Sequence, residues 1–127
     1  MKNTALALTL ALAGVASMTA YADFEETVER CERLQERAVK VMVQRQDGES
    51  LVEALTENQR RMNKSVKELT EKGLKELAND MRVLYGVDRT LLLKAWKTPV
   101  AETQTEQSQI ADAFGQQMLR VCLNTNL

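Results

Sequence analysis

Cys31 and Cys122 are the residues of this chain whose chemistry is clearest from their type and spacing. A disulfide persists in an oxidising compartment, and two cysteines allow only one intramolecular pairing. The alternative is a redox-active pair, which usually needs cysteines close together in the sequence, as in C-x-x-C. Because these two lie far apart, we expect a structural disulfide, which the loop-entropy model values at about 4 to 5 kcal/mol.

Histidine is absent from the sequence, which removes the side chain that most often runs acid–base chemistry near neutral pH. Imidazole ligands for zinc, copper and haem are therefore also excluded, and Met62 and Met118 have no histidine to complete a haem site. Glycine-rich phosphate loops and G-x-S-x-G elbows do not occur. We expect no catalytic residue, no cofactor and no metal, and therefore no enzyme. The enzymatic alternative is a hydrolase that acts through carboxylates on cell-wall glycans.

Residues 1–22 have the three zones of a cleavable secretory signal. Lys2 gives a positive start, and the apolar run from Ala5 to Val15 is shorter than the roughly 20 residues that span a bilayer. Ala20 and Ala22 are the small residues that signal peptidase accepts. We predict cleavage after Ala22, export to the periplasm or beyond, and no transmembrane segment in the mature chain. The alternatives are a retained N-terminal anchor and a buried helix that is merely rich in alanine and leucine.

Apolar residues recur at spacings of three and four in four segments of residues 23–127, which predicts a single all-α domain. The expected helices cover residues 24–46, ended by Asp47-Gly48; residues 50–73, begun by a Ser50–Glu53 capping box; residues 74–96; and residues 103–122, begun by Thr103–Glu106. In an up-and-down bundle of about four helices, the last helix ends beside the start of the first. Cys122 and Cys31 fall in those two places.

The third helix leaves one question of continuity open. Its apolar stripe is Leu74, Leu77, Met81, Leu84 and Tyr85. Gly86 then breaks or kinks the helix, because an interior glycine costs about 1 kcal/mol relative to alanine. If the helix breaks there, Asp88 is placed to cap a further segment.

Charge excludes some partners. The chain has 17 basic and 18 acidic side chains, a net charge of −1, and so lacks the footprint of a nucleic-acid or anionic-lipid binder. A basic strip consists of Arg60, Arg61, Lys64 and Lys67, and its first three residues are candidate contacts for an acidic partner, with a solvated helix face as the alternative. Trp96 is either an exposed binding anchor or a plug at the end of the core.

Two resemblances to known families follow from short motifs. Leu55-Thr56-Glu57-Asn58-Gln59 resembles the L-T-x-x-Q element of the periplasmic Spy and CpxP-like chaperones, although the second copy of that element is missing. A broader pattern resembles short, uncharacterised exported proteins of Gram-negative bacteria and prophages; its elements are Cys31, Val41-Met42, Arg45-Gln46 with Gly48, Ala95-Trp96 before Pro99, Phe114 and Cys122. This second resemblance implies no activity, and it nominates Arg45 and Gln46 as interaction residues.

Taken together, the sequence predicts an exported, non-enzymatic module that binds another protein or an envelope component. A holdase-type periplasmic chaperone is the alternative that the L-T-x-x-Q element implies. The sequence specifies neither the partner nor the oligomeric state.

Overall fold

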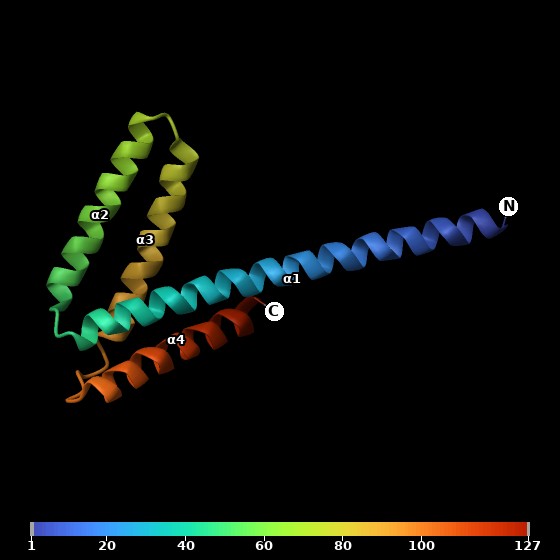
Figure 1. The fold of residues 1–127 in the computed structure, drawn as a ribbon. Coiled ribbons are helices and arrows are strands. Elements are labelled where there is room, and N and C mark those ends of the chain that lie inside the picture. The colour runs from blue at the N-terminus through green and yellow to red at the C-terminus, as the bar shows by residue number, and fades with distance from the viewer. Residues whose placement is uncertain (1, 127) are drawn as a thin grey trace.

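The computed structural model describes the backbone of residues 2–126 and the side chains of residues 22–126 (Figure 1). Its four helices are α1 (Lys2–Gln46), α2 (Leu51–Glu71), α3 (Lys75–Ala95) and α4 (Gln104–Asn126). The predicted all-α fold is confirmed. The predicted signal peptide, residues 1–22, falls almost wholly outside the described side chains, and its cleavage stays a prediction. No helix of the described residues is long and apolar enough to cross a membrane.

Short-range signals in the sequence set the ends of the helices. Gly48 follows α1 with a φ of 88°, and Gly73 follows α2 with a φ of 75°, a left-handed conformation that glycine adopts without steric cost. Ser50 caps α2 by accepting a hydrogen bond from the backbone N–H of Glu53 at 3.1 Å, and Thr103 plays the same part before α4. These signals predicted the end of α1 and the start of α2 and α4, whereas α1 begins at Lys2 instead of Phe24 and α4 continues past Cys122 to Asn126.

Helix α3 runs without a break through Gly86, which answers the question that the sequence left open. Asp88 therefore lies inside α3 and caps no further segment; its carboxylate instead accepts hydrogen bonds from Arg37 of α1. An interior glycine costs only about 1 kcal/mol. Burial of Leu91 and Leu92 in the core, downstream of the glycine, is enough to offset that cost.

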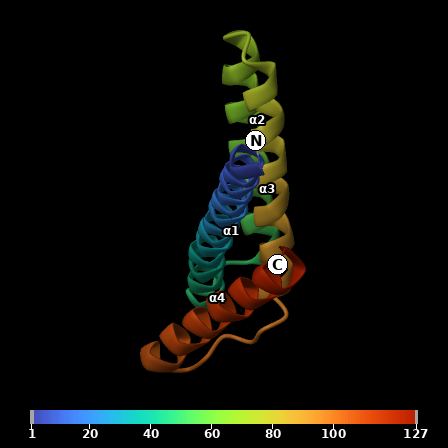
Figure 2. The ribbon, with the colours of Figure 1, turned by 90° about the vertical axis from the view of Figure 1, so that its right-hand side faces the viewer.

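The helices form two antiparallel pairs, α1 with α4 and α2 with α3 (Figure 1). The disulfide between Cys31 and Cys122 joins the first pair, with Cα atoms 5.5 Å apart, as the sequence predicted. The second pair is the α2–α3 hairpin. The base of the hairpin contacts α1, and the rest of the hairpin extends away from α1, as Figure 2 shows from a second direction. The molecule thus consists of a disulfide-joined base and a projecting hairpin.

The buried core lies in the base and in the lower part of the hairpin. Its residues are Ala38, Val41, Met42, Ala54, Leu91, Leu92, Ala95, Ala111, Phe114 and Met118. Helix α3 contributes to it only from Leu91 onward, and α2 only at Ala54. In the upper part of the hairpin, Ala78 is the buried apolar residue. The two halves of α3 therefore have different environments.

Candidate functional site

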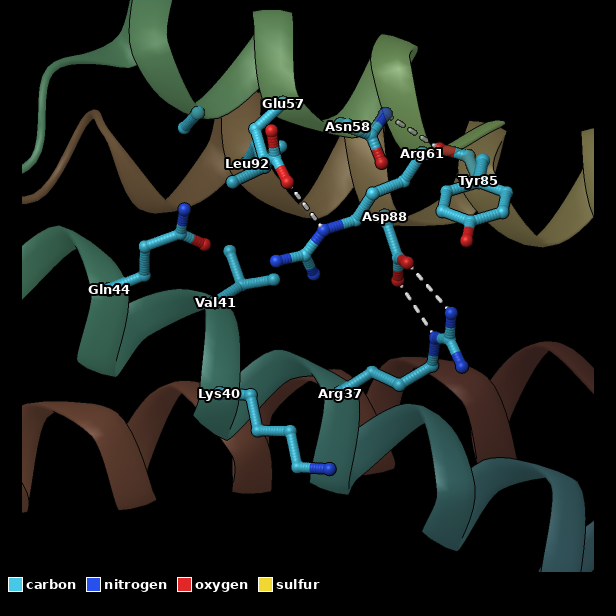
Figure 3. A pocket seen from close by; sticks show the side chains of 11 residues that line it. Arg37, Lys40, Val41, Gln44, Glu57, Asn58, Arg61, Tyr85, Asp88 and Leu92 are labelled. Atoms are coloured by element: carbon cyan, nitrogen blue, oxygen red, sulfur yellow. Dashed lines mark hydrogen bonds and ion pairs between the residues drawn. The ribbon is translucent and has the colours of Figure 1, made fainter. Parts of the chain in front are cut away.

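A cleft of about 340 Å³ lies where α1, α2 and α3 meet at the base of the hairpin (Figure 3). We call it the three-helix cleft; its lining residues are Arg37, Lys40, Val41, Gln44, Ala54, Glu57, Asn58, Arg61, Tyr85, Asp88 and Leu92. Val41, Ala54 and Leu92 are buried and form its apolar floor. Its charged side chains are three cations and two carboxylates, so the lining has a net positive charge.

Arg37 and Asp88 form the interhelical ion pair of the cleft. The Nε and Nη2 groups of Arg37 donate to the two carboxylate oxygens of Asp88, at 2.8 and 2.7 Å (Figure 3). The hydrogen bond to Asp88 raises the pKa of Arg37 above its usual value, against the lowering effect of partial burial. A bidentate pair has defined geometry, and it therefore fixes which face of α1 is turned toward α3.

Glu57 holds two of the predicted basic residues. It accepts hydrogen bonds from Nη2 of Arg60 at 2.6 Å and from Nε of Arg61 at 2.8 Å, all within α2. These bonds lower the pKa of Glu57 to about 2. The glutamate therefore stays ionised near neutral pH, which is unsuited to a general acid.

The structure separates the members of the predicted basic strip. Arg61 points into the space between α2 and α1 and lines the three-helix cleft (Figure 3). Arg60 instead lines a hollow between α2 and α3, together with Gln59 of the L-T-x-x-Q element. Lys64 is exposed one turn further along α2. Of the three, Arg61 alone faces α1.

Arg45, Gln46 and Trp96 lie together at the other end of α1, where they hold the α3–α4 loop. Arg45 donates from Nε to the Thr98 carbonyl at 2.9 Å, and its guanidinium lies 5.7 Å from the centre of the Trp96 ring. The Trp96 indole N–H donates to the carbonyl of Glu49 at 3.1 Å. These contacts fasten the end of α1 to the end of α3.

Gln46 is buried, with 3 % of its surface exposed. Both the nitrogen and the oxygen of its side-chain amide form hydrogen bonds with the backbone of the α3–α4 loop. Its nitrogen donates to the Pro99 carbonyl at 3.1 Å, and its oxygen accepts from the backbone N–H of Ala101 at 2.8 Å. The structure thus gives Arg45 and Gln46 an internal partner, the loop backbone, and half-buried Trp96 packs against the core.

The apolar stripe of α3 is only partly covered. Leu74, Leu77 and Leu84 are 46 %, 43 % and 36 % exposed, whereas Leu91 and Leu92 on the same helix are buried. We call these three leucines the open face of α3. An amphipathic helix normally turns such a stripe to the core, and no feature of the sequence indicates that α1 diverges from α3 above Asp88. Arg37 and Asp88, which mark the point of divergence, were not among the predicted site residues.

Comparisons with models of protein families, with curated proteins and with solved structures find no match to this chain.

Proposed function

We propose that this chain is an exported, non-enzymatic protein-binding module of the bacterial periplasm, and that the α2–α3 hairpin is its binding element. The observation that carries the proposal is the open face of α3. Large apolar side chains grouped on one exposed surface are a feature of interaction sites, whereas isolated ones are ordinary. Leu77 and Leu84 are two turns apart on one side of the helix, and the half-buried Met81 lies between them on that side.

The construction of the base supports this proposal. The disulfide joins α1 to α4, and Gln46 with Arg45 fastens α1 to the loop after α3. A base held in this way presents the hairpin in a fixed orientation, which lowers the entropy lost when a partner binds. The disulfide also suits the oxidising compartment to which the predicted signal peptide directs the chain.

Site-specific photo-crosslinking in the periplasm tests the proposed function. A photoreactive residue replaces Leu77 in one variant and Val52, which is 74 % exposed at the start of α2, in a matched control. We expect a discrete crosslinked product from position 77 and none from position 52. Equal products from both positions would contradict a specific role for the open face, and no product from either would contradict a binding role for the hairpin.

Export has its own test in the intact mass of the protein purified from the periplasm. The mass should correspond to a chain that begins at Asp23 and lacks two hydrogens because Cys31 and Cys122 are joined. A chain that retains residues 1–22 would show that the N-terminal segment is kept.

A holdase-type chaperone is the second candidate, and the same open face favours it because unfolded clients bind exposed apolar surface. The two functions differ in selectivity. A holdase at equimolar concentration suppresses aggregation of several unrelated unfolding proteins, and replacement of Leu77 and Leu84 by serine should abolish that effect. A binding module leaves aggregation unchanged and gives one crosslinked product.

A further inference from the structure

We infer that the partner of the open face is an acidic amphipathic helix of another protein, whose apolar side chains cover α3 and whose carboxylates contact α1. This inference rests on the proposed function and specifies the chemistry of the partner. It follows from the distribution of charge on α1 and from the way α1 and α3 diverge from the Arg37–Asp88 ion pair.

Helix α1 carries a basic stripe that consists of Arg30, Arg33, Arg37 and Lys40, at successive spacings of three, four and three residues. Such spacings put all four side chains on one side of the helix. The bond from Arg37 to Asp88 shows that this side is turned toward α3. Among the described residues, Arg37 alone in this stripe has a carboxylate within 4.0 Å.

Four glutamates of α1 lie on a different side, whereas Asp23 and Glu26 precede Arg30 on the side of the basic stripe. Glu25, Glu29, Glu32 and Glu36 are exposed and follow one another at spacings of four, three and four. They form an acidic stripe next to the basic one. None of them is within 4.0 Å of a basic side chain among the described residues. From Arg30 to Lys40, the side of α1 that is turned toward α3 therefore carries four basic residues and no acidic one.

The open face lies at the level of the basic stripe. Two contacts, Arg37 with Asp88 and Arg45 with Trp96, join α1 to α3 in the same order along both helices, which cross at the base of the hairpin. Arg33 lies one turn before Arg37 on α1, and Leu84 lies one turn before Asp88 on α3, so both are on the same side of the ion pair. The helices diverge from this point (Figures 1 and 2), and Leu84 and Leu77 become exposed.

A helix placed against α3 beside α1 therefore meets an apolar surface on one side and cations on the other. From Lys75 to Val87, α3 carries two basic and two acidic side chains, Lys75 and Arg82 against Glu76 and Asp80, so the basic stripe dominates the local charge. The open face extends over about three turns, which suits an amphipathic helix of about that length. Carboxylates on its flanks complement Arg30 and Arg33.

A second copy of the chain fits this surface less well. A two-fold symmetric contact pairs the same surface of both copies, and it would bring one basic stripe close to the other. Like charges brought together at an interface are unfavourable. Charge therefore favours a partner of a different sequence.

Two synthetic helical peptides of about four turns test the inference. Both carry leucine at the same positions; one has glutamate on its flanks and the other has lysine. Binding to the oxidised protein is measured by fluorescence anisotropy at two salt concentrations. We expect the acidic peptide to bind more tightly by about tenfold or more, and to weaken as salt rises, because exposed charges are screened.

Charge-reversal variants test whether the basic stripe of α1 contacts the acidic peptide. The double variant Arg30→Glu/Arg33→Glu should weaken binding of the acidic peptide by about tenfold or more, whereas the matched control Arg89→Glu/Arg120→Glu, with the same net charge, should bind as the wild type does. All four arginines are exposed, so both variants are expected to fold. Equal binding of the two peptides, or equal effects of the two variants, would overturn the inference. A dimer by sedimentation whose dissociation exposes Leu77 would also overturn it.

The crosslinking experiment at Leu77 separates this inference from the proposed function. If the product in the periplasm persists unchanged in Arg30→Glu/Arg33→Glu, the hairpin still binds a protein but the partner is not recognised by its acidity. If the wild type gives no product, the proposed function fails as well.

Discussion

Gln46 shows how much structure can depend on one buried polar residue. Its amide satisfies a carbonyl and an N–H of the α3–α4 loop, which would otherwise lie partly buried without partners. The position next to Arg45 was nominated by a sequence pattern as a site of interaction. The sequence does not reveal that the partner is internal, because that depends on where a loop more than fifty residues away comes to lie.

Replacing Gln46 with alanine should lower the free energy of unfolding by about 2 kcal/mol, because both loop groups lose their hydrogen bonds. Urea denaturation followed by circular dichroism measures the change. Gln116→Ala, on the exposed side of α4, is the matched control and should change stability by less than about 0.5 kcal/mol. Equal effects of the two substitutions would mean that Gln46 does not hold the loop.

Glu57 offers a titration that reports on its two arginines. Its carboxyl group should titrate by NMR with a pKa of about 2, because hydrogen bonds from Arg60 and Arg61 favour the ionised form. A pKa lowered in the folded state gives a stabilisation that is present above the unfolded pKa of about 4.3 and is lost as the pH falls toward 2. In Arg60→Gln/Arg61→Gln the titration should return to the usual glutamate range. An unchanged midpoint in that variant would show that the arginines are not the cause.

At the scale of helices, features set by neighbouring residues could be predicted from the sequence better than features that depend on packing between helices. The cap at Ser50 and the glycine after α1 operate through residues a few positions away, so they are readable from the sequence. Whether α3 continued through Gly86 was not readable, because the answer depends on packing of its second half against α1. The close approach of α4 to α1 at Gly115 was also missed, since nothing in the sequence distinguishes that glycine from Gly86.

The two helical glycines should respond to alanine in opposite ways. A Cβ at Gly115 would lie 2.5 Å from Cγ2 of Val39 and 3.3 Å from the backbone oxygen of Gln35. Gly115→Ala should therefore destabilise the protein by about 1 to 3 kcal/mol, since α4 has to move away from α1. At Gly86 a Cβ meets nothing within 4 Å, so Gly86→Ala should stabilise by about 0.5 to 1 kcal/mol. Thermal unfolding of both variants tests the pair, and destabilisation by Gly86→Ala would contradict the observed space around it.

At the scale of the whole molecule, the cysteines gave a sequence-based constraint on which helices meet. They predicted that the first and last helices pair, and the structure confirms it. They contain no information about the hairpin. Hydrophobic periodicity defines which side of a helix is apolar, but it does not define the angle at which two helices cross. That is why the stripe at Leu77 and Leu84 could be recognised from the sequence while its exposure could not.

Breaking the disulfide should have the largest effect on stability of any change considered for this chain. Cys31 and Cys122 are 91 residues apart in the sequence, so their bond restricts nearly the whole unfolded mature chain. Cys31→Ala/Cys122→Ala should lower the free energy of unfolding by about 4 to 5 kcal/mol in the loop-entropy model. Alanine is chosen because serine would bury a hydroxyl at Cys31, which is 1 % exposed.

Reduction of the wild type gives an independent measure of the same quantity, because it opens the loop without changing the sequence. The double substitution and reduction leave different atoms in the core. If the bond acts mainly on the unfolded state, the two decreases in the free energy of unfolding should therefore agree to within about 1 kcal/mol. The hairpin supplies an internal reference: hydrogen exchange at the buried Ala78 of α3 should accelerate along with exchange in α4 if the molecule unfolds as one unit. Faster exchange in α4 alone would show instead that the disulfide stabilises the base without stabilising the hairpin that we propose to be the binding element.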